Sequence, residues 1–586
     1  MNKKFINNIL GCCAIVCALS ACTDVWEAHY QADKPISGQE NSSDKTLWDL
    51  IESDQELTEF KDLLVMTGYD SLLRMNRSYT VWAPVNGSGF IVIADDVNPE
   101  KPNKELNKKR IVENHIANFI HPASGVLNKE DRKNYKMVEM LNTKMYDFEG
   151  SPKSPYTFAG KELSASNIVA KNGMLHKLDG YVGFAANIWE QLGDEPQVSK
   201  LWKFLAKDYK REFNPSASVQ GPVVDGQVTW LDSAFTESCR WFREIGWLDR
   251  EDSSYTMYAL SDNAWDEMYE MTKKYFNYPA DMQTLPAKGN LTAEEATDSM
   301  VMNLMCQNLV FSNSVNKSFY EGKCDTLRSN YLYGYQIFEN EEAHALSNGT
   351  IGGYPKELSN GTLYVVDKVN YEPFTCWHDT LRVEGENLSV SADDDENNFD
   401  YSESTLSRHF IALDDDSLNL YYNLSGHSVG VFEATTGKQV NPKFKFNIRN
   451  VLSANYRISI VLLPPQLINP SDTAFLRPNK FDARLANHAD STVLLGTFIS
   501  DSLKLRRGEI DTIVLAENYY IPVCEYDYNN LTGNPSNTYL SIESAIEFGT
   551  KRDPQENNGN DRDTTNWKYD NHFRIDQVIF EPVKAE

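Results

Sequence analysis

The sequence contains little cysteine and lacks the short motifs by which common enzymes are recognised. Nine cysteines occur in 586 residues, and four of them fall within the first 22 residues. The other five show no regular spacing, which favours buried thiols over a disulfide framework, although two could pair in an exported protein. The sequence has no G-x-x-x-x-G-K-[ST] loop, no H-E-x-x-H and no C-x-x-C. These absences remove the phosphate-binding loop, the zinc-protease helix and the dithiol redox site from consideration.

Long apolar runs and excess positive charge are also missing. After the N-terminal region no apolar stretch reaches the roughly 18 residues that would predict a membrane-spanning helix. The 84 acidic and 56 basic residues give a formal charge of -28, which argues against nucleic acid or anionic lipid as an electrostatic partner. Hydrophobic residues at 41% and aromatic residues at 12% are sufficient for packed cores. The length predicts about three or four domains.

One catalytic-type motif is present, a G-x-S-x-G match at residues 426–430. A nucleophile elbow needs a strand before this turn and a helix after it. Residues 431–437 are too few and too rich in β-branched side chains for that helix, so we interpret the match as a hairpin turn. Cys376 and His378 lie close together in sequence, but no third group can be assigned to orient them. The carboxylate pairs of glycoside hydrolases have no compact motif and stay open, yet we expect a protein that is not an enzyme.

The N-terminus predicts the destination of the protein. Two lysines precede a short apolar run over residues 9–19, and the sequence Leu-Ser-Ala-Cys then ends at Cys22. This ending resembles a bacterial lipobox, which implies removal of residues 1–21 and lipidation of the Cys22 thiol. An ordinary secretory signal is the alternative. Residues 22–43 form a polar tether whose acidic residues resemble the export signals of surface lipoproteins in gut Bacteroidetes. We therefore expect a lipid-anchored protein of the outer membrane that faces the cell exterior.

Two landmarks occur twice in the same order and at similar separation. Residues 79–86 (YTVWAPVN) and 255–262 (YTMYALSD) alternate like half-buried strands and end at a turn-forming Asn or Asp. Residues 172–179 (NGMLHKLD) and 360–367 (NGTLYVVD) follow them. The repetition predicts a duplicated domain.

The landmarks of the first copy resemble the two hallmark boxes of fasciclin-like domains. Residues 111–116 (IVENHI) resemble the central histidine segment of that family. The second copy departs from the family pattern at three positions: Leu260, Asn308 and Tyr364. The resemblance implies two α/β wedge domains, at residues 44–186 and 198–373, of which the second is divergent and carries insertions.

Apolar spacing predicts the helices of each copy. The first copy should begin with helices over residues 46–51 and 57–64, capped by Asp44 and ended by Gly68. We also expect helices over the ranges 111–119, 201–205 and 234–244. Two inserted segments, 210–232 and 278–296, are polar and are predicted to lie on the surface, where binding specificity is often placed.

His115 and His121 lie close enough in sequence to be considered as metal ligands or a recognition element. No third ligand stands at the spacing of a metal site, and a histidine on an apolar helix is usually part of the core. We therefore assign them a structural role.

The C-terminal third, residues 374–586, is predicted to be an antiparallel β-sandwich. Its expected strands are 418–423, 443–448, 456–463, 492–498, 511–515, 539–546 and 573–580. The last of these resembles the closing strand of jelly-roll modules of the carbohydrate-binding type. The fold class is therefore α+β: two fasciclin-like α/β wedge domains followed by a jelly-roll-like sandwich.

Exposed aromatic rings in this sandwich are the candidate ligand site, because a flat ring covers the apolar face of a pyranose. Trp567 and Tyr569 precede the last strand, and Tyr526 and Tyr528 lie in another polar loop. Burial in the core is the alternative for each. The acidic segments 393–396, 414–416 and 553–563 could hold structural calcium, although solvated loops explain them more simply. We expect no other cofactor and no catalytic residue.

These observations predict a surface lipoprotein that binds a nutrient ligand, most plausibly a glycan. It would act as an accessory to a starch-utilisation-type importer, with the importer barrel and its lid lipoprotein as partners. One alternative is a cell-surface adhesin that acts through its fasciclin-like repeats, and another is a surface polysaccharide hydrolase.

Overall fold

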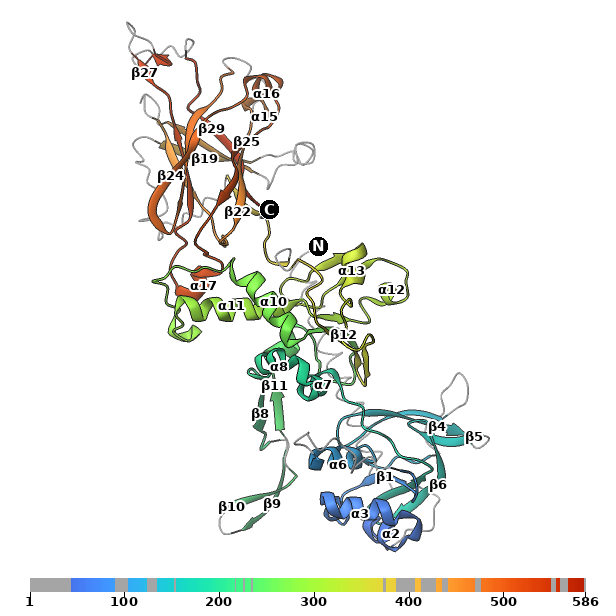
Figure 1. Cartoon of the computed structure of the whole chain (residues 1–586). Helices are drawn as coiled ribbons and strands as arrows, with labels where there is room; N and C mark the ends of the chain where they lie inside the picture. The colour runs from blue at the N-terminus through green and yellow to red at the C-terminus, as the bar shows by residue number, and fades with distance from the viewer. Residues whose placement is uncertain are drawn as a thin grey trace, which may run out of the picture. The chain divides into compact units, whose positions relative to one another are not determined.

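The computed structural model describes most of the chain after residue 43 (Figure 1). The described residues are 44–89, 104–123, 134–151, 154–216, 218–224, 227–232, 235–372, 376–385, 406–412, 428–434, 441–468, 476–549, 555–558 and 567–583. They divide into two compact units. The first comprises Met1–Asp194, Trp247–Tyr255 and Lys356–Leu363, and the second comprises Glu195–Gly246, Thr256–Pro355 and Tyr364–Glu586. No helix among the described residues is long and apolar enough to cross a membrane.

The first unit is built on a sheet of seven strands in the order β2-β1-β7-β6-β5-β4-β3. The strands are β1 (Tyr79–Pro84), β2 (Ile116–Asn118), β3 (Asn134–Glu139), β4 (Met145–Ser151), β5 (Ser154–Phe158), β6 (Lys161–Ala170) and β7 (Gly173–Leu178). β1 and β7, which carry the two sequence landmarks of the first copy, run parallel and are hydrogen-bonded neighbours. Every residue of β1 is buried. The two landmarks are therefore neighbouring interior strands of one sheet.

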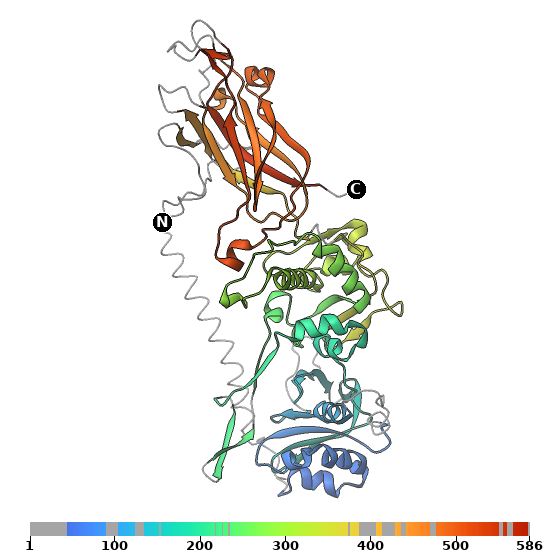
Figure 2. The same ribbon diagram turned by 60° about the vertical axis from the view of Figure 1, so that its left-hand side comes forward.

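Alternate residues of β1 face two different cores. Val81 packs in the core that the helices form on one face, and Trp82 packs with Phe148 and Phe158 on the other. The helices are α2 (Leu47–Ser53), α3 (Thr58–Thr67), α4 (Tyr69–Leu73) and α6 (Lys104–Glu113). In both views α2 and α3 lie together on one side of the sheet (Figure 2). β1 is therefore buried on both faces and is not the half-buried strand that the alternation predicted, because a second core covers the face opposite the helices.

The helix ends follow capping chemistry, with one correction to the prediction. α2 begins after Thr46, not after Asp44. The Thr46 hydroxyl accepts a hydrogen bond from the Asp49 amide at 3.2 Å, and the Asp49 carboxylate accepts one from the Thr46 amide at 2.8 Å. This reciprocal capping box satisfies two of the free amides, and Asp44 has no matching partner three residues later. Gly68 ends α3 with φ of 81°, as predicted.

The helix predicted over residues 111–119 is wrong in its second half. α6 ends at Glu113, and β2 begins at Ile116, which lies opposite Val81 of β1. The Trp82 amide donates to the His115 carbonyl at 2.9 Å, and the Phe119 amide donates to the Ser78 carbonyl at 2.9 Å. Pairing with the edge of β1 therefore replaces the helical hydrogen bonds that the apolar spacing had indicated.

An Asn-Gly pair builds the same connection in both copies. The side chain of Asn172 accepts from the Leu47 amide at 2.7 Å and donates to the carbonyls of Leu73 and Met75 at 2.8 and 2.7 Å. Gly173 follows with φ of 156°, and a Cβ there would lie 2.0 Å from the Tyr79 carbonyl oxygen. A side chain is therefore excluded where β7 begins.

Asn360 repeats this arrangement. Its side chain accepts from the Ile188 amide at 2.9 Å and donates to the carbonyls of Leu248 and Arg250 at 2.8 and 3.0 Å. A Cβ on Gly361 would lie 1.9 Å from the Tyr255 carbonyl oxygen. Because Ile188 takes the place of Leu47, the second copy begins at α7 (Ile188–Asp194), before the boundary at 198 that the sequence indicated.

The sheet of the second copy has the order β13-β12-β17-β16, which repeats the order β2-β1-β7-β6. Its strands are β12 (Tyr255–Leu260), β13 (Val310–Ser312), β16 (Lys356–Leu358) and β17 (Gly361–Val366), and a separate pair is formed by β14 (Thr326–Arg328) and β15 (Ile337–Glu339). The helices are α8 (Ser199–Ala206), α9 (Arg240–Glu244), α10 (Asp262–Lys273), α11 (Ala293–Gln307), α12 (Lys317–Tyr320) and α13 (Asn340–Ala345). The strand order repeats as the duplicated landmarks predict.

The helix predicted over 234–244 is shorter than expected. Its first part is β11 (Phe235–Ser238), which pairs with β8 (Lys210–Phe213), and only α9 is helical. The rings of Phe213 and Phe235 meet edge to face at 5.8 Å on this ribbon. The inserted segment continues as a hairpin of β9 (Val219–Val224) and β10 (Gln227–Asp232).

The second insertion, 278–296, is not the free surface segment that its polarity predicted. Tyr278 is 4% and Met282 5% exposed. The Tyr278 hydroxyl donates to the Tyr526 carbonyl at 2.8 Å, and the Leu285 amide donates to the Leu531 carbonyl at 2.9 Å. The insertion therefore joins the second copy to the C-terminal sheets within the second unit.

The C-terminal region consists of two antiparallel sheets. One has the order β19-β20-β29-β22-β25 with β18 also paired to β29, and the other has the order β21-β26-β23-β24. The bounds are β18 (Leu381–Glu384), β19 (Leu406–Ala412), β20 (Ser428–Ala434), β21 (Lys443–Asn447), β22 (Asn455–Leu462), β23 (Lys480–Asn487), β24 (Ala489–Ile499), β25 (Asp511–Tyr520), β26 (Tyr539–Ser544) and β29 (Phe573–Pro582). Phe432 stacks on Phe444 at 4.1 Å, and Phe481 meets Phe573 at 5.8 Å, so the two sheets share one core.

The sequence prediction found six of these strands and missed β18, β19, β20 and β23. The strand expected at 418–423 lies outside the described residues. Only short helices interrupt the described sheets: α15 (Pro465–Ile468), α16 (Ser502–Arg507) and α17 (Tyr528–Thr532). Two short strands, β27 (Phe548–Gly549) and β28 (Asn557–Asn558), pair with each other and lie between β26 and β29 in the sequence.

Candidate functional site

The four aromatic residues predicted to bind a ligand do not form one platform. Tyr569 and Tyr528 are each 6% exposed, so neither ring offers a free face to a sugar. Tyr569 lies beneath the Lys480 and Lys568 ammonium groups, at 5.5 and 5.2 Å from its centroid. Tyr528 meets the His488 ring at 5.7 Å. These contacts place both tyrosines in the core, the alternative that the sequence had left open.

Trp567 and Tyr526 retain partly accessible rings. Trp567 is half-buried and meets Phe548 edge to face at 6.1 Å. Tyr526 is half-buried and contributes to a cavity described below. Cys22, the predicted lipidation site, lies outside the described residues, as do the acidic segments 393–396 and 414–416.

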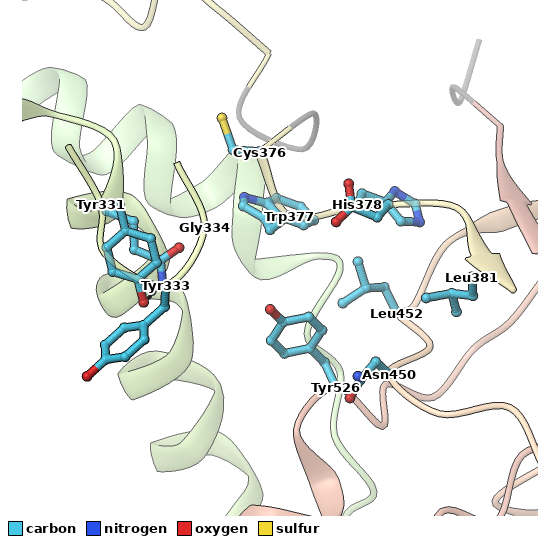
Figure 3. A pocket seen from close by; sticks show the side chains of 12 residues that line it. Tyr331, Tyr333, Gly334, Cys376, Trp377, His378, Leu381, Asn450, Leu452 and Tyr526 are labelled. Carbon is cyan, nitrogen blue, oxygen red and sulfur yellow. Dashed lines mark hydrogen bonds between the residues drawn. The ribbon is translucent and has the colours of Figure 1, made fainter. Parts of the chain in front are cut away.

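A cavity of about 330 Å³ lies within the second unit (Figure 3). Its lining residues are Gln307, Tyr331, Tyr333, Gly334, Cys376, Trp377, His378, Asp379, Leu381, Asn450, Leu452 and Tyr526. The segment between β14 and β15 supplies one wall and the segment that leads into β18 supplies another. The connections before β22 and before α17 supply Asn450, Leu452 and Tyr526, and the end of α11 supplies Gln307. Loops carried by rigid sheets are where binding residues are commonly found.

Trp377 is the most constrained aromatic residue of the cavity. It is 6% exposed, and its ring meets Tyr275 and Phe276 edge to face, each at 5.2 Å. Its buried indole nitrogen has no hydrogen-bond acceptor among the described residues. In Figure 3 that nitrogen lies at the end of the ring nearer Cys376 and Tyr331. A buried donor without an acceptor is costly, so this nitrogen reduces the stability that the packing of the ring provides.

Tyrosine rings form the remaining aromatic surface. Tyr331 and Tyr333 meet edge to face at 5.8 Å, and Tyr333 is 65% exposed. The Gln307 amide donates to the Tyr331 hydroxyl at 3.1 Å, which orients that ring. Tyr526 packs edge to face on Phe276 at 5.7 Å. One buried and several accessible rings thus border a single concave space.

Three titratable side chains of the cavity, His378, Tyr331 and Tyr526, are neutral at neutral pH. Burial lowers the pKa of His378 to about 4, so the imidazole carries no charge. Burial raises the pKa of Tyr331 to about 12. Burial also raises the pKa of Tyr526, and the nearby carboxylates of Asp527 and Asp379 raise it further. The cavity therefore presents hydroxyl, amide and indole groups rather than a charged cluster.

The arrangement does not resemble a catalytic site. Ser428, the serine of the G-x-S-x-G match, is the first residue of β20, so a strand follows it instead of the helix of a nucleophile elbow. Cys376 and His378 line the same cavity, but the Cys376 sulfur points away from the imidazole in Figure 3. No group of three His, Cys, Asp or Glu residues that could hold a metal ion occurs in the described part of the chain.

His115 and His121 are structural, as predicted. His115 is fully buried, and its ring accepts from the Val182 amide at 3.0 Å while its other nitrogen lies 2.8 Å from the Ile111 carbonyl. The His121 ring bonds to the Asn118 carbonyl at 2.8 Å and to the Lys136 ammonium at 2.5 Å. Both rings therefore satisfy backbone or side-chain groups of the first unit.

Sequence reasoning missed most of the cavity. Tyr526 was a candidate, whereas Tyr331, Tyr333 and Trp377 were not. The run YLYGY at 331–335 was a usable signal, because three tyrosines around a glycine are unusual in a polar connection. Trp377 had no such signal, since only the folded chain brings it beside Tyr526.

Comparisons with known proteins identify part of the chain. Residues 55–182 match the family model described as "Fasciclin domain". No curated protein matches the chain. A FAS1 domain pair from the insect cell adhesion molecule fasciclin I is 13% identical, with a TM-score of 0.20, and the match covers 55% of this chain and 98% of that one.

Two other solved structures are also similar to the chain. A Paenibacillus xanthan lyase is 9% identical with a TM-score of 0.18, covering 38% of this chain and 16% of that one. The CBM22-1 xylan-binding domain of Paenibacillus barcinonensis Xyn10C is 12% identical with a TM-score of 0.17, and the match covers 35% of this chain and 95% of that one. TM-scores this low do not support a functional comparison. The family match confirms the resemblance of the first copy: residues 55–182 form a Fasciclin domain.

Proposed function

We propose that the protein is a surface lipoprotein that binds a glycan in the cavity formed by Tyr331, Tyr333, Trp377 and Tyr526. The observation that carries this proposal is the combination of aromatic rings and neutral polar groups around one concave space. Sugars present apolar faces that stack on aromatic rings and hydroxyls that exchange hydrogen bonds with side chains. The volume of about 330 Å³ is at the lower end of ligand pockets, which span roughly 300–1,000 Å³, so it would hold a short stretch of a chain.

The other parts of the chain are given roles that fit this function. The Fasciclin domain and the second copy, which we propose is a divergent fasciclin-like domain, serve as a spacer and contact platform. We propose that the C-terminal sandwich is jelly-roll-like, and that it supplies Asn450, Leu452 and Tyr526 to the cavity. Lipidation at Cys22 would hold the protein on the outer membrane, facing outward.

Binding is tested by a substitution on the cavity wall that should not disturb the core. Tyr333 is 65% exposed, so Tyr333→Ala is expected to fold normally and to weaken glycan binding about tenfold or more through the loss of a stacking ring. Tyr354→Ala is the matched control, because Tyr354 is 75% exposed and does not line the cavity. The measurement is affinity electrophoresis of the full chain through gels that contain polysaccharides. Equal retention of both variants and the unchanged protein would remove the cavity from the binding site.

A partnership with an importer needs a separate experiment. Affinity capture of the lipidated protein from gently solubilised outer membranes is expected to recover a transport barrel and its lid lipoprotein in stoichiometric amounts. The substrate of that importer would then indicate the ligand. Recovery of the protein alone would contradict the partnership and leave glycan binding as an independent activity.

Adhesion is the second candidate function, and the Fasciclin domain favours it because this domain is typical of surface and adhesion-type proteins. The Tyr333→Ala variant also distinguishes glycan binding from adhesion. If Tyr333→Ala abolishes polysaccharide retention but preserves attachment of expressing cells, adhesion resides outside the cavity. If attachment is also lost, the cavity serves attachment through a surface glycan.

A further inference from the structure

The charges around the cavity are distributed unevenly. Among the described residues that line it there is one carboxylate, Asp379, and there is no lysine or arginine. A bound anion in a protein normally requires a guanidinium, an ammonium or several convergent backbone amides. The lining offers hydroxyl, amide and indole groups in their place. The cavity therefore lacks, within the described chain, the groups that would replace the hydration of an anionic ligand.

Carboxylates outside the lining, those of Asp527 and Glu244, also act on the tyrosines of the cavity wall. Asp527 follows Tyr526, and together with Asp379 it raises the pKa of that phenol, which shows that both negative charges are felt at this wall. Glu244 raises the pKa of Tyr331 at the other wall. At Tyr331 the Arg240 guanidinium acts against Glu244, so the excess of negative charge is assigned to the wall that carries Asp379.

Two arginines near the Tyr331 wall, Arg240 and Arg328, contact other groups. The Arg240 guanidinium, which acts on Tyr331, lies 2.5 Å from the Asp208 carboxylate and also bonds to Asn303. The Arg328 guanidinium lies over the Tyr335 ring at 3.7 Å, and Arg328 does not line the cavity. Neither guanidinium belongs to the lining, where Asp379 is the charged side chain among the described residues.

We propose that this cavity selects uncharged glycan chains and rejects chains whose sugars carry carboxylate or sulfate groups. The inference rests on the proposed glycan binding and names the class of glycan. The Asp379 carboxylate on the cavity wall would repel a carboxylate or sulfate group of the ligand. Rejection by charge is strongest at low ionic strength and weakens as salt is added.

The test compares pairs of oligosaccharides that have the same type of sugar linkage and differ in charge. The probes are β-1,4-glucan and β-1,4-glucuronan oligosaccharides, mannan and mannuronan oligosaccharides, and fully methyl-esterified and de-esterified galacturonan. Titration calorimetry with the full-length protein is expected to show at least tenfold tighter binding of the uncharged member of any pair that binds. Asp379→Asn is expected to reduce this ratio on the order of tenfold, because one negative charge is removed from the wall.

Asp527→Asn should reduce the ratio by a smaller factor. The φ of Asp527 is 55°, a left-handed conformation that asparagine tolerates, so the fold should persist. Asp62→Asn is the control, because Asp62 has 65% side-chain exposure on α3 and should leave the ratio unchanged.

The outcomes distinguish this inference from the proposed function. If the charged member binds as well as or better than its neutral partner, the charge selection is wrong although glycan binding stands. A preference for neutral chains that neither salt nor Asp379→Asn reduces would also overturn it, since the selection would then be steric. If no probe of either class binds, the proposed function fails and this inference fails with it.

Discussion

Replacing Lys144 by alanine is expected to destabilise the first unit by about 3–5 kcal/mol, the cost of removing one partner from a buried ion pair. Lys144 is 1% exposed. Its ammonium lies 2.8 Å from Glu190, 2.6 Å from Glu251 and 3.1 Å from the Ser359 hydroxyl. Glu251 has only 6% side-chain exposure. Without the lysine the two carboxylates would face each other with little water to solvate them.

The position of Lys144 makes the effect structural as well as electrostatic. Lys144 belongs to the Fasciclin domain, Glu190 lies in α7, and Glu251 and Ser359 come from later segments of the first unit. Asn187 also bonds to both carboxylates, at 2.9 and 3.2 Å. One ammonium therefore joins the Fasciclin domain to the start of the second copy, and its loss should separate their unfolding transitions.

The measurement is guanidinium unfolding of the full chain with a fluorescence probe. Lys200→Ala is the control, because the ion pair between Lys200 and Asp266 is exposed and should contribute about 1 kcal/mol or less. A triple variant, Lys144→Met with Glu190→Gln and Glu251→Gln, should recover much of the loss because no charge then remains buried. A loss below about 1 kcal/mol in Lys144→Ala would contradict the assigned role.

The sequence predicted the features that depend on local pattern or on repetition. The landmark at 79–86 correctly indicated a strand, because buried strands require apolar residues, whereas the landmark at 172–179 was recognised only as a repeated segment and forms β7. Gly68 correctly marked the end of α3, since only glycine adopts a left-handed cap without cost. Such signals are contained within a few neighbouring residues.

Features that depend on distant partners were not predictable in the same way. The start of the second copy at Ile188 became visible only through its bond to Asn360. The insertion at 278–296 appeared free because its polar residues conceal Tyr278 and Met282, which are buried by the sandwich. Tyr569 and Tyr528 appeared suited to sugar binding because their loops are polar, yet packing covers both rings. Burial by tertiary contacts overrides local composition in each case.

Acidification is expected to destabilise the Fasciclin domain between about pH 6.5 and 4, because its three histidines are buried in the neutral form. Burial lowers the pKa of His115, His121 and His176 from 6.5 to about 4. The Lys136 ammonium contributes to the shift at His121. As the pH falls through 6.5 the unfolded chain binds protons that the folded domain does not bind, so the free energy of unfolding decreases. The stabilisation is complete above pH 6.5 and is lost by about pH 4, where the folded histidines also titrate.

Each histidine should account for up to about 3 kcal/mol of this loss, since one pKa unit corresponds to about 1.4 kcal/mol. The measurement is guanidinium unfolding at intervals from pH 7.5 to 4, with attention to pH 5–6.5, where carboxylates contribute less to the slope. His176→Gln is expected to reduce the pH dependence of the free energy of unfolding by the contribution of one proton. The variant should still fold, because the glutamine amide can donate to the His121 carbonyl, which lies 3.0 Å from the imidazole in the unchanged protein. His344→Gln is the control, because His344 has 60% side-chain exposure and lies outside this domain. A free energy of unfolding that stays constant over this range would show that the three imidazoles are protonated equally in the folded and unfolded states.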